Sequence, residues 1–539
     1  MVTMWFLAFL ALPAQAQPAA KAADAPDEAK LWGRWERTFT AGDAGDPETE
    51  IVAELTSPTG KKTAVDGFWD GGTTWKIRFM PHEEGLWSFT TKSSPPAGGL
   101  TGISGKIRVS KETDGNAFHG SGALRVSKSG THLEHADGTP FFWLGDTCWN
   151  GTLFSTKEDW AQYLDTRAAQ GFTVIQFNVM APWRAAPSDA EGETAFSGLE
   201  NVKIRPQFFR RLDERMEALA QRGLVAAPVL IWSLTRKDPG NYLPEKDLVR
   251  LARTLVARYQ AHHVVWVLAG DNPYDKERAE RWKVVGRAVF GSGARAPVTT
   301  HPTGMNWPWE SFREESWLTV LGYQSGHGDS PETLQWIHSG PPARNWSKSP
   351  ARPVINLEPP YEGHLSYQSR KPHSDYNVRR AVYWSLLSTP IAGVTYGGHG
   401  VWSWHEKPGQ EPTDHPGTGA APVWRDALNL PGAKQMTHAA KLLSSLAWWM
   451  LRPDPALVMN QSEDPAKFIA ASRTEKGNLA LFYLPVGGEL RVKKGEVLDT
   501  AEARWFDPRR GEYTPAKRNA PGVLEAPSTD DWLLIVKSS

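Results

Sequence analysis

This 539-residue sequence has little cysteine, no excess of positive or negative charge, and no long hydrophobic run. Cys148 is the single cysteine, which excludes an intrachain disulfide and a cysteine-based zinc cluster. Lysine plus arginine and aspartate plus glutamate both total 60, so no basic excess indicates nucleic acid or an anionic membrane surface. No apolar run is long enough for a transmembrane helix. We therefore expect neither nucleic acid nor membrane as a partner of the mature chain.

The N-terminal segment MVTMWFLAFLALPAQAQPAA resembles an export signal. Its apolar run from Met4 to Leu12 is too short to span a bilayer, and Ala14 and Ala16 are small residues that suit a signal peptidase. The segment before this run carries no lysine or arginine, unlike most signal peptides. We interpret residues 1–16 as a signal peptide and residues 17–30 as a linker. This interpretation predicts a periplasmic or secreted bacterial protein.

Tryptophan is the residue in excess, with 26 copies. Indole rings fill hydrophobic cores, and this explanation is favoured for any single tryptophan. Indoles also stack on the C–H faces of sugar rings while their N–H group donates a hydrogen bond. The excess therefore favours a carbohydrate ligand without assigning any one tryptophan to it.

Both ends of the mature chain have the pattern of short antiparallel strands. Between residues 31 and 112, alternating segments are separated by turns such as SPTGKK and WDGGTTW, which predicts an N-terminal β-sandwich. From residue 447 to residue 539, segments such as LALFYLP and DWLLIVK predict a second antiparallel β-sandwich.

The region at 120–446 alternates apolar strands with amphipathic helices. Helix candidates such as 156–171 and 206–223 each end in a glycine that suits a helix stop. Buried parallel strands are almost continuously apolar. The predicted strands of this kind are 141–146, 172–179, 224–232, 263–271, 297–302, 318–324, 353–358 and 392–398. Eight strands alternating with helices predict a central (β/α)8 TIM barrel, and hence a multidomain chain with a β-sandwich on each side of it.

In a (β/α)8 barrel, the active site is built from residues at the C-terminal ends of the strands. We expect Asp271 and Glu358 to be catalytic. We expect the other polar and aromatic residues at these strand ends to contact substrate: Asp146, Trp149, Asn178, Trp183, Trp232, His301, Gln324, His327, His399 and Trp402.

The two carboxylates have the placement that glycosidic hydrolysis requires. One acid must protonate the leaving oxygen, and a second carboxylate must attack the anomeric carbon or activate water. Asp271 ends the fourth strand and Glu358 the seventh, across the barrel mouth. Asp271 in AGDNPYD could instead start a turn, and Glu362 is the rival of Glu358 in the same loop. Asp146 is either a substrate contact or a structural acid that binds loop backbone.

Two other functions fit parts of this pattern. His301, His327 and His399 on one rim suggest a metal-dependent hydrolase, but they lack the close spacing of a metal-binding helix and no cysteine assists them. We therefore expect no metal and no cofactor. The chain could also be a non-catalytic protein that binds polysaccharide or matrix and carries a relic barrel. The retained carboxylate pair argues against this alternative, because a relic need not keep both acids.

Several segments together resemble the apiosidase-like (β/α)8 glycoside hydrolases: FFWLGDTCWN, GFTVIQFNVMAPW, WVLAGD, GYQSGHG and INLEPPYEG. The N-terminal FWDGGTTWKIRFMPHEEGLWSF resembles the β-sandwich that often precedes this barrel, and the C-terminal ARWFDPRRGEY resembles a β-sandwich named for collagen binding. The resemblance implies an exported retaining glycoside hydrolase of plant or microbial polysaccharide, with Asp271 as general acid/base and Glu358 as nucleophile. Related barrels more often have Asn-Glu where this chain has Gly270-Asp271. Apiose side chains are one target of this diverse family, so the resemblance does not imply a particular sugar.

Overall fold

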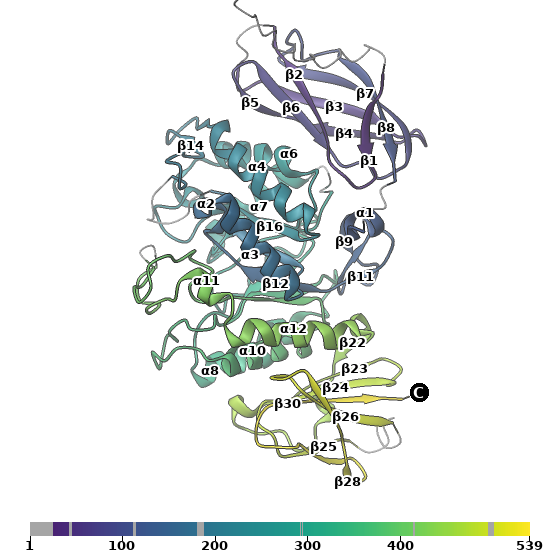
Figure 1. The fold of residues 1–539 in the computed structure, drawn as a ribbon, viewed down its shortest axis with the longest axis vertical. Coiled ribbons are helices and arrows are strands. Elements are labelled where there is room, and N and C mark those ends of the chain that lie inside the picture. The colour runs from purple at the N-terminus through teal and green to yellow at the C-terminus, as the bar shows by residue number, and fades with distance from the viewer. Residues whose placement is uncertain are drawn as a thin grey trace, which may run out of the picture.

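The computed structural model describes residues 25–538 except 43–45, 112–114, 181–187, 292, 294, 413–414 and 494–500. The predicted signal peptide lies outside the described residues. Along the long axis, a β-sandwich, a barrel and a second β-sandwich follow one another in chain order (Figure 1). Within the described ranges, no helix is both long enough and apolar enough to cross a membrane.

The N-terminal sandwich packs a five-stranded sheet, β1-β8-β7-β3-β4, against a three-stranded sheet, β2-β6-β5. Its strands are β1 (Asp27–Lys30), β2 (Trp35–Thr40), β3 (Glu50–Thr56), β4 (Lys62–Asp66), β5 (Phe68–Gly71), β6 (Thr74–Phe79), β7 (Gly85–Ser94) and β8 (Ser104–Ser110). Trp35, Trp75 and Trp87 lie in its core. The predicted linker is too long, because residues 27–30 pair in parallel with β8 as the edge strand β1.

Eight parallel strands form the barrel, in the order β18-β17-β16-β13-β12-β21-β20-β19. They are β12 (Trp143–Thr147), β13 (Val174–Asn178), β16 (Val225–Trp232), β17 (Trp266–Gly270), β18 (Val298–Thr299), β19 (Leu321–Gln324), β20 (Val354–Glu358) and β21 (Gly393–Tyr396). Every residue of these strands is buried, as apolar parallel strands require. Between β18 and β19, the N–H groups of Thr319 and Val320 donate to the carbonyl of Val298. The predicted (β/α)8 barrel is confirmed.

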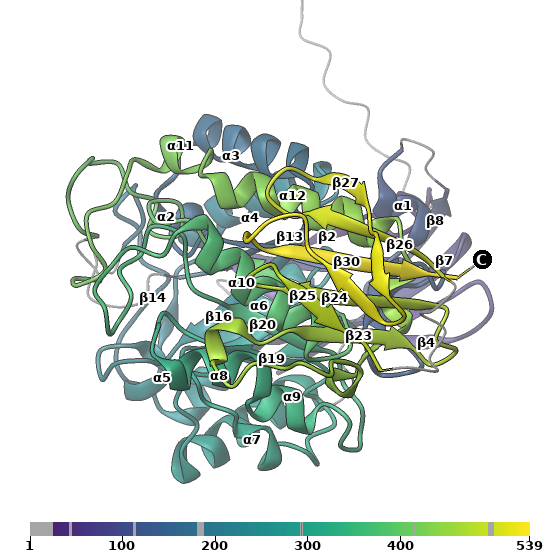
Figure 2. The same ribbon diagram turned by 90° about the horizontal axis from the view of Figure 1, so that it is seen from below.

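Helices surround these strands (Figure 2). The longer ones are α3 (Lys157–Ala169), α4 (Pro206–Gln221), α6 (Glu245–Tyr259), α7 (Lys276–Phe290), α8 (Pro331–Ser339), α10 (Asp375–Leu387) and α12 (Pro431–Ser444). Short helices lie in the connections: α2 (Gly151–Phe154), α5 (Pro239–Tyr242), α9 (Pro341–Asn345) and α11 (Trp424–Ala427). The two helices predicted at 156–171 and 206–223 are α3 and α4. Gly171 and Gly223 follow them with φ of 81° and 66°, the left-handed conformation that stops a helix.

A small unit closes the N-terminal face of the barrel. It consists of α1 (Ala117–Ser121) and the sheet of β9 (Leu124–Val126), β10 (Leu133–His135) and β11 (Pro140–Phe141). Phe118 and Leu133 of this unit share one core cluster with Val267 and Leu357 in the strands and with Trp402 near their C-terminal ends. The hydrophobic core therefore extends through the barrel from its closed N-terminal face to the tryptophan side chains at the C-terminal ends of the strands.

Buried ion pairs fix the N-terminal sandwich to the barrel. Arg78 of β6 donates to Asp213 of α4 at 3.0 and 2.7 Å. Arg258, at the end of α6, donates to Asp213 at 2.8 and 2.7 Å and to Asp70 of β5 at 2.8 Å. Burial opposes ionisation of Asp213, but the hydrogen bonds and charges of the two arginines hold its pKa well below the usual value.

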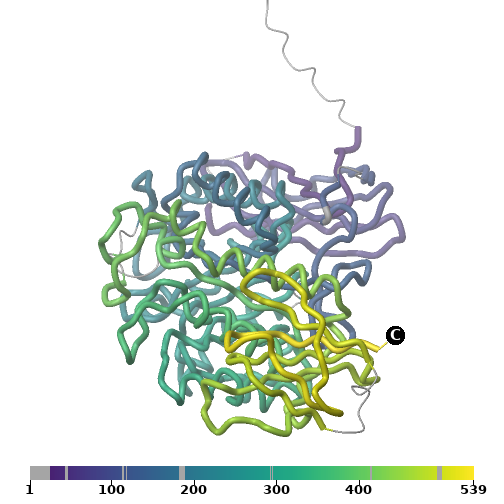
Figure 3. Tube along the Cα trace, turned by 60° about the horizontal axis from the view of Figure 1, so that its bottom comes forward, coloured from purple at the N-terminus to yellow at the C-terminus, as the bar shows by residue number. Residues whose placement is uncertain are grey.

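The C-terminal sandwich packs on the side of the barrel. Its sheets have the orders β22-β23-β24-β30-β26-β27 and β25-β29-β28. The strands are β22 (Leu451–Pro453), β23 (Ala470–Thr474), β24 (Leu479–Leu484), β25 (Glu489–Arg491), β26 (Glu502–Asp507), β27 (Glu512–Pro515), β28 (Arg518–Ala520), β29 (Val523–Glu525) and β30 (Trp532–Lys537). These strands, yellow in Figure 3, lie against α10, where Arg379 donates to both oxygens of Asp531 at 2.7 and 2.6 Å. No described residue of this sandwich lines the cavity at the C-terminal ends of the barrel strands.

Candidate active site

A cavity of about 290 Å³ lies at the C-terminal ends of the barrel strands. Its lining residues are Trp149, Trp232, Leu234, Asp271, Thr303, Gly304, Gln324, His327, Glu358, Tyr361, His364, Tyr367, Trp402 and His415. Among them are both predicted catalytic acids and five of the residues predicted to contact substrate: Trp149, Trp232, Gln324, His327 and Trp402. The cavity combines flat aromatic walls with a few polar groups, which is the usual composition of a small-molecule site.

The backbone of Glu358 is fixed at the end of β20. Its N–H group donates to Asn356 Oδ1 at 3.3 Å, and its carbonyl accepts from the N–H groups of Ser325 and Gly326 at 3.1 and 3.2 Å. Asn356 is itself held, because its Nδ2 donates to Ser325 Oγ at 2.9 Å. The carboxyl group therefore projects into the cavity from a rigid strand end.

Two histidines hold the carboxylate of Glu358. His327 Nε2 lies 2.9 Å from Oε1, and His301 Nε2 lies 3.3 Å from Oε2. The Tyr361 N–H donates to His327 Nδ1 at 3.3 Å, so Nδ1 is unprotonated and Nε2 carries the proton donated to Glu358. Burial opposes ionisation of Glu358, but these two histidines hold its pKa well below the usual value. Glu358 is therefore ionised at neutral pH.

Asp271 follows β17 in a strained conformation, with a φ of 52°. Its neighbour Asn272 anchors it: the Asn272 N–H donates to the carbonyl of His301 at 3.1 Å, and Asn272 Oδ1 accepts from the Tyr274 N–H at 2.8 Å. Asn272 Nδ2 also bonds Ser233 Oγ. This network holds the carboxyl group of Asp271 in the cavity that contains Glu358.

Burial, with a further contribution from the negative charge of Glu358, raises the pKa of Asp271 to about 7. Environments that push the pKa values of two carboxyl groups apart separate an acid from a base or nucleophile. Asp271 can therefore carry a proton at neutral pH while Glu358 stays ionised. Asp271 can protonate a leaving oxygen while Glu358 attacks the carbon atom from which that oxygen departs.

Gly270 precedes Asp271 and leaves no room for a side chain beside Trp232. A Cβ atom at Gly270 would lie 2.1 Å from Cε3 of Trp232, far inside van der Waals contact. Glycine at this position lets the indole of Trp232 lie against the end of β17. Gly397 acts similarly, since a Cβ atom there would lie 2.0 Å from Cδ1 of Tyr361. Both glycines bring an aromatic ring to the cavity wall.

Asp146 faces away from the cavity, which corrects its prediction as a substrate contact. Its Oδ2 accepts from the Tyr163 hydroxyl and from Arg167 Nε, both at 2.7 Å, and all three side chains are fully buried. Tyr163 and Arg167 belong to α3, so Asp146 points outward from β12 to the helix layer. The structural role considered for this acid is the one that the geometry favours.

Replacing Asp146 by alanine should lower the free energy of unfolding by about 3–5 kcal/mol, because it leaves the buried guanidinium of Arg167 without its carboxylate. Denaturant unfolding followed by fluorescence measures the loss. Asp165→Ala is the matched control, because Asp165 lies on α3 with Arg167 and forms an exposed pair with Arg222, which is worth about 0–1 kcal/mol. A fully stable Asp146→Ala protein without activity would restore the substrate role.

Three other predicted residues, His301, His399 and Asn178, lie outside the cavity lining. His301 lies behind Glu358, and His399 lies behind Trp402, whose indole N–H donates to His399 Nδ1 at 3.2 Å. Burial lowers the pKa of His399 to about 4, so its ring is neutral and donates from Nε2 to the Gly419 carbonyl at 2.8 Å. Asn178 is buried at the end of β13. Trp183 lies outside the described residues.

Glu362, the rival of Glu358, lies behind the cavity wall. Its Oε2 accepts from the Tyr396 hydroxyl at 2.6 Å and from the Gly432 N–H at 2.9 Å. Both partners hold this carboxyl group in the protein interior, and burial raises its pKa. Glu362 is therefore a structural residue of this loop.

Sequence reasoning missed several lining residues in the loop after β20. His364 stacks on His327 with ring centroids 4.2 Å apart, and its Nδ1 donates to the Leu365 carbonyl at 2.7 Å. Tyr361 and Tyr367 line the cavity from the same loop. The sequence could have indicated these residues by their position just after the strand that ends in the predicted nucleophile, since the catalytic faces of such barrels are built from these loops.

Among the described residues, no group of three or more His, Cys, Asp and Glu side chains is placed to hold a metal ion.

Comparisons with known proteins identify the family of this chain. The family model "Apiosidase-like, catalytic domain" matches residues 127–450, which is more than half of the chain. A domain of unknown function, DUF5060, matches residues 28–94, and the "Putative collagen-binding domain of a collagenase" matches residues 452–537. A search of curated proteins found no match.

Solved structures of glycoside hydrolases share the fold. One described as a glycoside hydrolase family 5 protein from Bacteroides vulgatus is 24% identical, with a TM-score of 0.68 over 78% of this chain and 94% of its own. A putative glycoside hydrolase from the same organism is 18% identical, with a TM-score of 0.71 over 95% of this chain and 100% of its own. The family match spans the barrel and both carboxylates of the cavity. The chain therefore belongs to the apiosidase-like family and is a glycoside hydrolase.

Proposed function

We propose that this protein is an exported, retaining glycoside hydrolase of plant or microbial polysaccharide, with Glu358 as nucleophile and Asp271 as general acid/base. The observation that carries the proposal is that two carboxyl groups lie in one cavity in environments that favour opposite protonation states. The two adjacent histidines favour the ionised form of Glu358, whereas burial favours the protonated form of Asp271. The export part of the proposal rests on the N-terminal segment.

In the first step, a carboxylate oxygen of Glu358 bonds to the anomeric carbon as the bond from that carbon to the leaving oxygen breaks. Asp271 gives its proton to that oxygen, so the leaving group departs as an alcohol. In the second step, Asp271 takes a proton from water, and the resulting hydroxide displaces Glu358. Two inversions at one carbon leave the product with the configuration of the substrate.

The walls of the cavity support a sugar substrate. Trp149, Trp232 and Trp402 present indole rings, and the volume of about 290 Å³ is near the lower end of the usual range for small-molecule sites. Gln324 Oε1 is buried without a hydrogen-bond partner in the described part of the chain. A hydroxyl group of a bound sugar would satisfy it.

The pH dependence of kcat/KM should show which group is the acid. Asp271 must be protonated to donate, so kcat/KM should fall as pH rises through about 7. Glu358 must be ionised, and its lowered pKa should keep activity high well into the acidic range. Initial rates on an oligosaccharide substrate across pH 4 to 9 measure the fall above pH 7 and the plateau below it. If the loss above pH 7 persists in Asp271→Asn, the acid is another group.

The stereochemical outcome tests the mechanism directly. A screen of pectic and hemicellulosic oligosaccharides with product analysis identifies the sugar, and proton NMR of the first-formed product gives its anomeric configuration. We expect retention. A matching 2-deoxy-2-fluoro glycoside with a reactive leaving group should label the peptide that contains Glu358. Inversion would contradict the mechanism, and failure of the unmutated protein to hydrolyse any glycan would favour the polysaccharide-binding alternative.

A further inference from the structure

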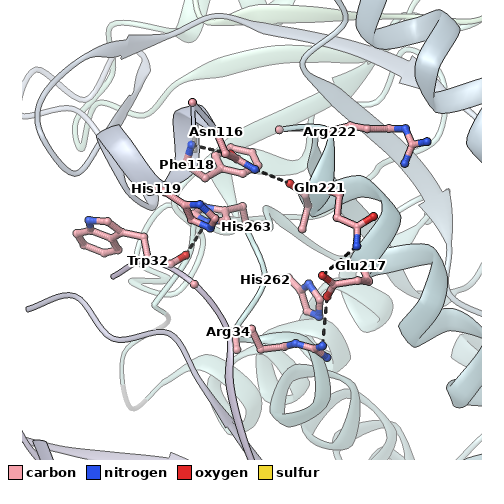
Figure 4. A pocket seen from close by; sticks show the side chains of 15 residues that line it. Trp32, Arg34, Asn116, Phe118, His119, Glu217, Gln221, Arg222, His262 and His263 are labelled. Atoms are coloured by element: carbon pink, nitrogen blue, oxygen red, sulfur yellow. Dashed lines mark hydrogen bonds and ion pairs between the residues drawn. The ribbon is translucent and has the colours of Figure 1, made fainter. Parts of the chain in front are cut away.

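A second cavity of about 610 Å³ lies between the N-terminal sandwich and the closed face of the barrel (Figure 4). Its walls come from four segments: residues 32–34 before β2, residues 115–119 around α1, residues 217–223 at the end of α4, and residues 261–263 before β17. It shares no lining residue with the catalytic cavity. Because Asp271 follows the other end of β17, the two cavities lie at opposite ends of one strand.

The walls of this second cavity alternate hydrogen-bond donors with acceptors. Arg34 from the sandwich lies 3.2 Å from Oε2 of Glu217 on α4, and Gln221 Nε2 donates to Glu217 Oε1 at 3.5 Å (Figure 4). Asn116 Nδ2 donates to the Ala220 carbonyl at 2.9 Å. Guanidinium, carboxylate and amide groups thus lie side by side on surfaces from both domains.

His262 has a buried ring nitrogen without a hydrogen-bond partner in the wall of this cavity. Its side chain is 5% exposed, and its Nε2 has no hydrogen-bond partner among the described residues. Its neighbour His263 also has a buried nitrogen without such a partner, Nδ1, whereas its Nε2 lies 3.1 Å from the Trp32 carbonyl and its ring stacks on Phe118 at 3.9 Å. Buried polar groups are nearly always hydrogen-bonded, so His262 Nε2 is a candidate hydrogen-bonding group for a bound ligand. Burial lowers the pKa of His262, which leaves a neutral ring.

The backbone of this region is also strained. Trp32 adopts a φ of 59°, which is rare for a bulky residue. This conformation directs its carbonyl to His263 at the cavity wall. Such strain persists where the surrounding structure imposes it, and it concentrates at binding sites.

We propose that this interdomain cavity is a second, non-catalytic carbohydrate site for a neutral ligand of one or two sugar units. Sugar hydroxyls both donate and accept, which matches walls of mixed donors and acceptors. An anionic ligand fits less well, because Arg34 is paired with Glu217, and Arg222 donates to Asp165 at 2.7 and 3.2 Å. The volume lies within the range of about 300–1,000 Å³ that small-molecule sites occupy. The position between two domains is also common for such sites.

Binding can be measured in a protein whose catalytic cavity has lost its nucleophile and one of its indole walls. In the double variant Glu358→Gln, Trp402→Ala, we expect saturation-transfer NMR to detect binding of at least one of xylose, arabinose, galactose and cellobiose. Adding Glu217→Ala or Gln221→Ala should weaken that binding by about tenfold or more, because a hydrogen bond to a bound hydroxyl is lost. Adding Glu214→Ala should not change it, since Glu214 lies exposed on the same helix outside the lining.

Thermal unfolding of each variant confirms that the fold is kept. The proposal is overturned if the double variant binds none of the four sugars at millimolar concentration. It is equally overturned if the remaining binding is unaffected by both Glu217→Ala and Gln221→Ala in folded protein. Hydrolysis by the unmutated protein is a separate measurement, so failure of this site and failure of the retaining mechanism are distinguishable.

Discussion

Glu358→Gln should lower kcat on any hydrolysed glycan by about 10⁴-fold or more, the scale seen when a catalytic nucleophile is removed. The amide keeps the size of the side chain but cannot form the glycosyl ester. His327 and His301 contact the side-chain oxygens of Glu358, so the fold around the site should persist. Product release measured by chromatography gives the loss, and a polysaccharide pull-down should show that binding is kept.

Glu362→Gln is the control for this prediction, because it makes the same change four residues further along the same loop. Glu362 bonds Tyr396 and Gly432 behind the wall, so its substitution should affect stability more than chemistry. A second check is chemical rescue: azide should restore turnover of an aryl glycoside by Glu358→Ala and give a product of inverted configuration. Hydrolysis that survives Glu358→Gln but is lost in Glu362→Gln would exchange the two roles.

Asp271→Asn should lower kcat/KM on natural glycans by about 10²- to 10⁴-fold, the usual contribution of a general acid. Asparagine has no acidic proton for the leaving oxygen. An aryl glycoside with a dinitrophenolate leaving group needs no such proton, so its kcat/KM should change little. Comparing the two substrates separates lost proton donation from lost binding, because lost binding lowers both values together.

Asp271→Asn should also stabilise the folded protein, and this effect has a defined pH dependence. The pKa of Asp271 is raised from 3.8 to about 7 in the folded chain, so its stabilising contribution is complete below pH 3.8 and is lost as pH rises to about 7. The loss is on the order of a few kcal/mol. Asparagine cannot ionise, so its gain in thermal stability should be larger at pH 8 than at pH 4. An equal shift at both pH values would argue against the raised pKa.

The strand pattern could be predicted because buried parallel strands are apolar on both faces, and eight such runs alternate with helices. The rule that barrel sites lie at strand ends then selected Asp271, Glu358 and the three cavity tryptophans. Because these strands are apolar on both faces, their sequence does not show which side chains point into the barrel and which point toward the helices. Asp146 and Leu144 share the outward face of β12, and nothing in that run distinguishes them from inward residues.

Loop residues were harder to predict than strand ends. His364 and Tyr367 reach the cavity because the chain after Glu358 folds back over His327. This path depends on contacts between the loop that follows β19 and the loop that follows β20. The Tyr367 N–H donates to the His327 carbonyl at 3.0 Å, and the two residues are far apart in sequence. Such pairings have no local signature, because no hydrophobic period sets the course of a loop.

By itself, the sequence determined the alternation of strands and helices, the flanking sandwiches and the identity of the two candidate acids. These features follow from local hydrophobic patterns and from chain order. The tertiary structure alone decided that Asp146 faces the helix layer, that two histidines hold Glu358, and that Asp271 is buried enough to keep a proton near pH 7. Protonation depends on burial and on neighbouring charges, and both are supplied by segments that only folding brings together.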